Sequence, residues 1–147
     1  MYSKAEAQKI KKDFWIQFAE NYPRKWILYQ TKIKDFAFKF HIDNKKAKVL
    51  LDIEPNDEKK RIIYFEKIES LKSILIEDFL PDAIFQRDFY LENGKIISRI
   101  WVEKENVSCN NKEDWPDIFN FFYTKMIKFE EFFCEYEDYI KDLETNT

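Results

Sequence analysis

Glycine is almost absent from this chain, because Gly94 is the only one in 147 residues. Loops that bind phosphates or dinucleotides need several glycines, since the backbone must approach the ligand closely and adopt positive φ angles. Histidine is equally scarce, with His41 alone, and the two cysteines, Cys109 and Cys134, lie far apart. These counts argue against nucleotide-binding loops, a histidine-rich metal site and a disulfide framework. We expect no cofactor and no catalytic residue.

Long apolar runs are also missing from the sequence. No segment approaches the ~20 apolar residues needed to cross a bilayer, and Met1 to Lys12 lack the apolar stretch of a signal peptide. We therefore expect a cytoplasmic protein that does not act at a membrane. The length predicts one domain over residues 1–147, large enough to form a core.

Aromatic residues are abundant, at 18% of the chain with fifteen phenylalanines, and they predict a core built on rings. Charge is unevenly distributed. Residues 1–48 carry twelve Lys and Arg against five Asp and Glu, whereas the rest of the chain is acidic and the net charge is −3. The basic part either attracts an anionic partner or balances the acidic part of the same molecule.

The first 54 residues predict a helix and a hairpin. Ser3 and Glu6 form a capping box, which predicts a helix from there to about Glu20, and Pro23 prevents its continuation. Apolar residues then alternate on both sides of Asn44-Lys45, which predicts a hairpin with a two-residue loop. The expected pairs are Ile42 with Ala47, Phe40 with Val49, Phe38 with Leu51 and Phe36 with Ile53.

Asn93-Gly94 is the strongest short hairpin signal in the chain. A two-residue loop there predicts that Glu92 lies opposite Lys95 and that Asp88 lies opposite Arg99. The same register points Arg87 toward the phenylalanine face. It assigns to that face the following residues: Phe85, Phe89, Leu91, Ile96, Ile100 and Val102.

Two further helices complete the expected fold. One begins at Asn56 or Asp57 and ends before Pro81, and another begins after Asp114. The apolar seam of the last helix comprises Phe122, Met126, Phe129, Phe133, Tyr136 and Ile140. The sequence thus predicts a single α+β domain of order α-ββ-α-ββ-α, with an antiparallel and four-stranded sheet that has helices on one face.

Four residues near Pro23 form a candidate nucleic-acid site. Arg24 and Lys25 supply cations, and Trp26 and Tyr29 supply rings, which is the combination that single-stranded nucleic-acid binders use. The alternative is that the two rings fill the junction between helix and sheet while the cations remain in solvent.

The outer face of the sheet gives a second candidate. Tyr90, Ile97 and Trp101 are expected on that face together with Leu50 of the first hairpin. If no helix covers them, these residues form an apolar patch of the kind that binds a partner or a second copy. If Trp26, Tyr29 or the last helix covers them, they belong to the core.

Asp35, Asp52 and Glu54 are weak candidates for a metal site, because clustered carboxylates bind Mg²⁺ or perform acid–base chemistry. The pattern does not match a metal-dependent nuclease, in which an acid and a lysine stand two residues apart on one strand. Glu103 and Lys104 are adjacent, so they point to opposite faces.

Several segments resemble a bacterial family, the domain of unknown function 4268. They are Met1-Tyr2-Ser3-Lys4, Phe14-Trp15, Pro23-Arg24-Lys25-Trp26, Thr31-Lys32-Ile33-Lys34-Asp35-Phe36, Leu51-Asp52-Ile53-Glu54, Tyr64-Phe65-Glu66-Lys67, Tyr90-Leu91-Glu92-Asn93-Gly94-Lys95 and Glu135-Tyr136-Glu137-Asp138-Tyr139. The resemblance implies an accessory role near nucleic acid, since the domain also occurs in larger proteins similar to restriction or nuclease components.

The leading hypothesis is a small interaction module without catalytic activity that binds a protein partner or forms a homodimer. The alternatives are a nucleic-acid-binding accessory domain and a divalent-metal-dependent hydrolase or nuclease.

Overall fold

Four antiparallel strands form one sheet in the order β1-β2-β4-β3 in a computed structural model that describes residues 2–143. The strands are β1 (Phe36–Ile42), β2 (Lys46–Ile53), β3 (Ile84–Tyr90) and β4 (Ile96–Glu105). The helices are α1 (Lys4–Asn21), α2 (Glu58–Ser70), α3 (Lys72–Asp78), the short η1 (Lys112–Asp114) and α4 (Trp115–Lys141). The predicted α+β class and the four-stranded antiparallel sheet are confirmed.

The first hairpin has the predicted register, and all four expected pairs are present. Its two-residue loop is held by the Asp43 carboxylate, which accepts hydrogen bonds from the backbone N–H groups of Lys45 at 2.7 Å and Lys46 at 2.9 Å. The positive φ angles found in residues 2–143 lie elsewhere, so this loop does not use the mirror-image turns typical of two-residue hairpins. The hydrogen bonds to Asp43 therefore stabilise this loop without the positive φ angles that such hairpins usually need.

The second hairpin differs from its prediction. Its loop has three residues, because the N–H of Leu91 donates to the carbonyl of Lys95, and Gly94 takes a φ of +88°. A turn followed by a left-handed residue is the usual geometry of three-residue hairpin loops. Tyr90 consequently pairs with Ile96 and Phe89 with Ile97. The predicted two-residue loop is wrong, and so is the predicted Glu92–Lys95 pairing.

A bulge between Gln86 and Phe89 shifts the register of β3 once more, so that Gln86 rather than Asp88 lies opposite Arg99. The predicted Asp88–Arg99 pair is therefore wrong, and Asp88 instead accepts from Arg61 at 3.1 Å. Phe89 turns to the outer face, where the Arg99 guanidinium lies 4.1 Å from its ring centroid. Arg87 is exposed rather than directed into the core.

The first two predicted helices are present with small changes. Ser3 caps α1 by accepting from the N–H of Glu6, as the capping box predicts. Asp57 caps α2, but the expected single helix before Pro81 is divided at Leu71 into α2 and α3. At the start of α4, Asp114 occupies the capping position without a capping bond, because its carboxylate accepts from the N–H of Ser108.

The seam of α4 packs along the phenylalanine face of the sheet. Phe129 lies 5.2 Å from Phe38 and Phe133 lies 5.7 Å from Phe36 between ring centroids. Every predicted seam residue except Tyr136 is buried, and at Tyr136 the helix kinks. With 27 residues, α4 is about 40 Å long at 1.5 Å per residue, so it spans the sheet.

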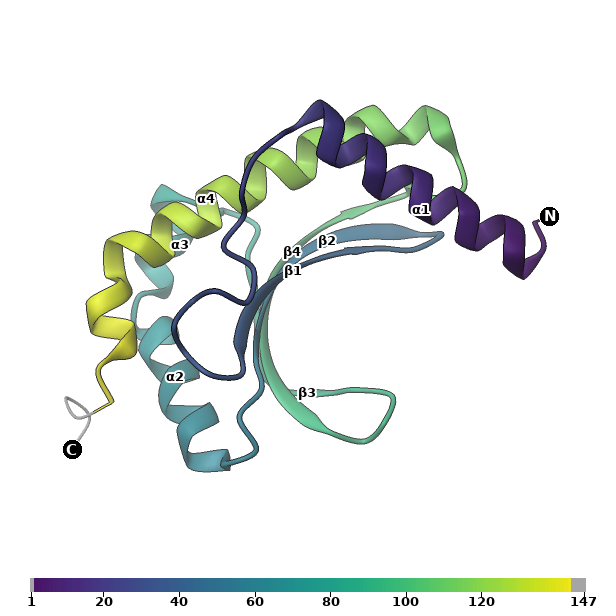
Figure 1. The fold of residues 1–147 in the computed structure, drawn as a ribbon. Helices are drawn as coiled ribbons and strands as arrows, with labels where there is room; N and C mark the ends of the chain where they lie inside the picture. Colours follow the sequence, from purple (N-terminus) through teal and green to yellow (C-terminus); the bar gives the residue numbers. More distant parts are fainter. Residues whose placement is uncertain (1, 144–147) are drawn as a thin grey trace.

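The sheet is strongly curved, with the helices on its convex side and its concave side left without a helix (Figure 1). The prediction of helices on one face is therefore confirmed. Within residues 2–143 no helix is both long and apolar enough to cross a membrane.

The Asp43 carboxylate gives the first hairpin a pH-dependent stability. Burial alone would raise its pKa, but hydrogen bonds from His41 and from the backbone of Lys45 and Lys46 lower the pKa to about 2. A depressed pKa stabilises the fold above the unfolded value of about 3.9, and this contribution disappears as the pH falls through about 2. We expect Asp43→Asn to flatten the stability profile between pH 4 and about 2, measured by urea unfolding. An unchanged slope would contradict this assignment.

Gly94 is the position where the chain requires glycine. A Cβ there would meet nothing within 4 Å, so the cost of a side chain is conformational rather than steric. We expect Gly94→Ala to lower the free energy of unfolding by about 1–2 kcal/mol, the cost of a left-handed L-residue. Gly94→Asn should cost less, because asparagine tolerates this conformation. Denaturant titration of both variants checks the order, and an equal loss would refute it.

Candidate functional site

An aromatic groove lies between α1, the connection that follows it and the edge strand β1. Its volume is about 550 Å³. The lining residues are Trp15, Phe18, Ala19, Tyr22, Pro23, Arg24, Lys25, Trp26, Leu28 and Phe40. The α1 spacing brings Trp15, Phe18 and Ala19 to one side of the helix, and Tyr22 follows at its C-cap. The groove thus joins residues of one helix with residues from a loop and a strand.

Trp26 forms one wall of this groove and also packs into the core. Its ring is stacked on Phe18 at 6.4 Å and meets Phe40 edge-on at 5.4 Å and Tyr123 at 5.9 Å between centroids. These contacts match the alternative reading of the sequence, in which the ring fills the junction between helix and sheet. They leave Trp26 partly accessible from the groove.

Arg24 is tied to a buried carboxylate. Its Nη2 donates to Glu130 Oε1 at 3.2 Å, while the backbone N–H of Ile27 donates to Glu130 Oε2 at 2.7 Å. Glu130 is only 4% exposed, and a buried charge is tolerated when it is paired and hydrogen-bonded. The Arg24 guanidinium also lies 5.1 Å from the Trp26 ring centroid. Arg24 therefore holds the segment between α1 and β1 against α4.

The other two residues of the nucleic-acid candidate are exposed. Lys25 lies at the rim of the groove, and Tyr29 is 76% exposed on the surface of the connection. The structure thus divides the four candidates, because Arg24 and Trp26 have structural partners whereas Lys25 and Tyr29 face solvent. Only three of them, Arg24, Lys25 and Trp26, line the groove.

Glu130 was not identified from the sequence. Glu130 lies next to Phe129, a residue of the apolar seam of α4. An acidic residue beside such a seam is partly buried, so it needs a cation or a backbone N–H from another part of the chain as its partner. The sequence cannot name that partner, because Arg24 is 106 residues away.

Three of the four residues of the outer-face candidate are buried. Ile97 is 0%, Leu50 4% and Trp101 7% exposed. Neither Trp26 nor α4 covers them. Instead, side chains of the same concave face do: Phe89 lies 5.8 Å from Trp101 between ring centroids, and the Lys48 Nζ lies 5.5 Å from the Trp101 centroid. Tyr90 is 68% exposed, but its pairing with Ile96 places it on the opposite face.

Charged groups on the concave face are paired with one another. Asp52 is fully buried and accepts from Arg99 at 2.6 and 2.9 Å and from Lys39 at 3.1 Å. Lys39 also donates to Glu54 at 2.9 Å. Burial alone would lower the pKa of Lys39, but its bonds to Glu54 and Asp52 raise it. The Glu103 pKa is lowered, chiefly because Trp101 Nε1 donates to that carboxylate.

The weak metal candidates do not form a common site. The Asp52 and Glu54 carboxylates are engaged by Lys39 and Arg99, whereas Asp35 lines a different hollow. Over residues 2–143 there is no group of three or more His, Cys, Asp or Glu side chains that could hold a metal ion.

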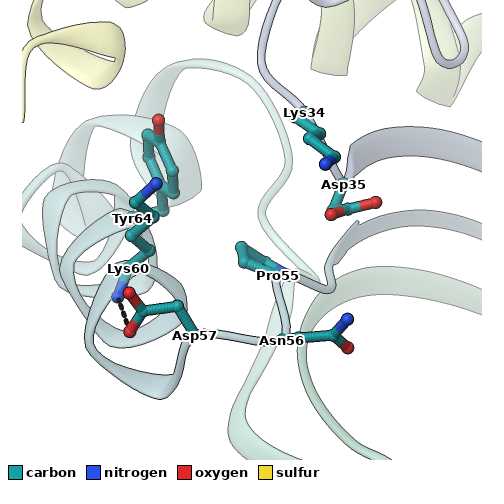
Figure 2. A pocket seen from close by; sticks show the side chains of 7 residues that line it. All are labelled: Lys34, Asp35, Pro55, Asn56, Asp57, Lys60 and Tyr64. Carbon is teal, nitrogen blue, oxygen red and sulfur yellow. Dashed lines mark hydrogen bonds between the residues drawn. The ribbon is translucent and has the colours of Figure 1, made fainter.

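A smaller hollow of about 240 Å³ lies where β1 begins and the β2–α2 connection passes (Figure 2). Lys34 and Asp35 line it on one side and Lys60 and Tyr64 on the other (Figure 2). The two lysines are balanced by Asp35 and Asp57, and Asp57 is already used as the cap of α2. This mixture of charges selects neither an anion nor a cation.

The Glu130 contacts predict a specific loss of stability. We expect Glu130→Ala to lower the free energy of unfolding by about 1–3 kcal/mol, because Arg24 and the Ile27 N–H both lose their acceptor. Glu130→Gln should lose less, since its amide oxygen still accepts from Ile27. Chemical unfolding of the two variants measures the difference. A Glu130→Ala variant as stable as the parent would contradict the role of this carboxylate.

Comparison with known proteins places the chain in one family. Curated proteins and solved structures gave no match. The family model described as "Domain of unknown function (DUF4268)" matches residues 10–137, which include the groove, the Arg24–Glu130 pair and the whole sheet. The resemblance noted in the sequence is thereby confirmed, and the chain belongs to the DUF4268 family.

Proposed function

We propose that this chain is a protein-interaction module that binds an acidic segment of another protein, with an apolar side chain of that segment seated in the aromatic groove. The observation that carries the proposal is the groove itself, whose volume of about 550 Å³ falls in the range of ligand-binding sites. Its walls supply aromatic rings from three separate parts of the chain.

The shape and chemistry of the groove favour a side chain as its ligand. Trp15, Tyr22, Trp26 and Phe40 are each partly buried, so their rings offer apolar surface without being free to move. Trp15 is stacked on Phe122 and Trp26 on Phe18, which fixes both rings from behind. Rigid aromatic anchors of this kind dominate the binding energy of protein interfaces.

The charge around the groove favours an acidic partner. Arg24 and Lys25 line it, and none of the lining residues within the described part of the chain is acidic. Arg24 shares its charge with Glu130, but Lys25 has no ion pair within residues 2–143. A partner with a carboxylate beside its apolar residue would therefore meet complementary charge, which contributes mainly to specificity and to the association rate.

Nucleic acid is a weaker candidate for the same surface. The observation in its favour is the exposure of Lys25 and Tyr29, which together offer a cation and a ring. However, Arg24 is neutralised by Glu130 and Trp26 is stacked in the core. Affinity for nucleic acid comes mainly from many phosphate contacts, so one free lysine at the groove supports it less well than it supports an acidic peptide.

Selection of a displayed random-peptide library on the purified protein tests the proposal. We expect enriched peptides to carry an aromatic or aliphatic residue next to Asp or Glu. Ala19→Trp should reduce their binding at least tenfold, because Ala19 is an exposed groove residue and the larger side chain fills the groove. Lys25→Glu should weaken binding by repulsion. Fluorescence of Trp15 and Trp26 reports occupancy.

Two matched variants serve as controls. Ala5→Trp places the same substitution on the exposed first turn of α1, and Lys9→Glu places the same charge change on that helix, both away from the groove. Peptides that bind all four variants equally well would overturn the proposal. Salt-sensitive binding of labelled single-stranded DNA or RNA, without any peptide enrichment, would favour nucleic acid instead.

A further inference from the structure

The edge of β1 is covered by the chain's own connection from α1. The N–H of Phe38 donates to the carbonyl of Leu28 at 3.0 Å. Antiparallel strands direct alternate residues toward each partner, and the bonds between Asp35 and Glu54 and between Asp43 and Lys46 show that odd residues face β2. The backbone groups of Phe38 and Phe40 therefore point to the free edge, and Leu28 occupies part of it.

This covering segment, residues 23–30, is here called the strap. Within residues 2–143 its polar fastenings to other parts of the chain are the Arg24–Glu130 pair, the Ile27 N–H bond to Glu130 and the Leu28 bond to Phe38. The residues that follow are anchored independently, because buried Thr31 bonds to the carbonyls of Ile33 and Phe36 and Ile33 is also buried. The strap can thus lift while its end remains fixed.

The backbone of the strap is strained where it meets β1. Leu28 has a φ of 48°, a left-handed conformation that is unfavourable for a bulky L-residue. Strain of this kind persists only while surrounding contacts hold it. The closed state of the strap is consequently held by the few bonds named above together with the packing of the Trp26 ring.

We propose that the strap opens as a unit separate from the rest of the fold, and that the open state exposes the β1 edge at Phe38 and Phe40 to an extended segment of a partner. Naming a protein segment as the occupant rests on the proposed function, whereas the opening itself does not. Phe40 lies both at this edge and in the closed groove, so lifting the strap, which carries Trp26 and Leu28, replaces one groove wall with a strand edge to which an extended segment can pair.

Amide hydrogen exchange measured by NMR tests the opening. The Phe38 N–H donates to the strap, whereas the backbone groups of Lys39, the next residue of β1, point toward β2. We expect the Phe38 amide to exchange faster than the Lys39 amide in the unmodified protein. Glu130→Gln should accelerate Phe38 and Ile27 by about tenfold, because it removes a charged hydrogen bond, while Phe38 should remain less protected than Lys39 in this variant as well. Glu131→Gln, an exposed neighbour on α4, is the matched control.

Equal protection of Phe38 and Lys39 in the unmodified protein, or no acceleration of Phe38 in Glu130→Gln, would show that the strap unfolds only with the whole sheet and would overturn the proposal. A synthetic peptide with the sequence of residues 26–32 tests the edge in the Glu130→Gln variant. We expect it to slow Phe38 exchange again, whereas a scrambled peptide should not. Rapid Phe38 exchange that this peptide does not slow would refute the open edge, while groove-dependent peptide selection would still support the proposed function.

Discussion

The packing of α4 along the phenylalanine face of the sheet is the contact on which the rest of the structure depends. The two hairpins alone would expose rows of rings such as Phe36 and Phe38, and α4 buries these against Phe129 and Phe133. Burial of large aromatic side chains is the main source of stabilisation in a domain of this size. The α1 helix then closes the remaining part of the same face through Phe14 and Phe18.

Because all helices lie on the convex side, the residues of the concave side are stabilised by contacts among the side chains of the sheet. Its apolar residues are covered by long side chains of neighbouring strands, and its charges are matched within the sheet, most clearly at the buried Asp52 with Arg99 and Lys39. Such a network holds its cations in place rather than offering them to a ligand. The interaction surface proposed for this chain therefore lies at the aromatic groove and the adjoining β1 edge.

Glu130 connects the core with that surface. One buried carboxylate on α4 holds both Arg24 and the Ile27 backbone, so the position of the groove wall depends on the helix that organises the core. The same contact is the main fastening of the strap. A single pair of oxygen atoms thus sets the shape of the groove in the closed state and controls access to the strand edge in the proposed open state.

The sequence by itself determined the elements whose signals are local. The capping box at Ser3, the pairing of Phe38 with Leu51 and the α4 seam follow from spacing alone, because alternation and helical periodicity act over a few residues. Tertiary structure decided the rest. At the bulge after Gln86 the Arg87 carbonyl accepts from Arg61, which lies in another element, and Trp101 is covered by Phe89 and Lys48 from two other strands. The partnership of Arg24 and Glu130 spans 106 residues, and no local pattern encodes a contact at that separation.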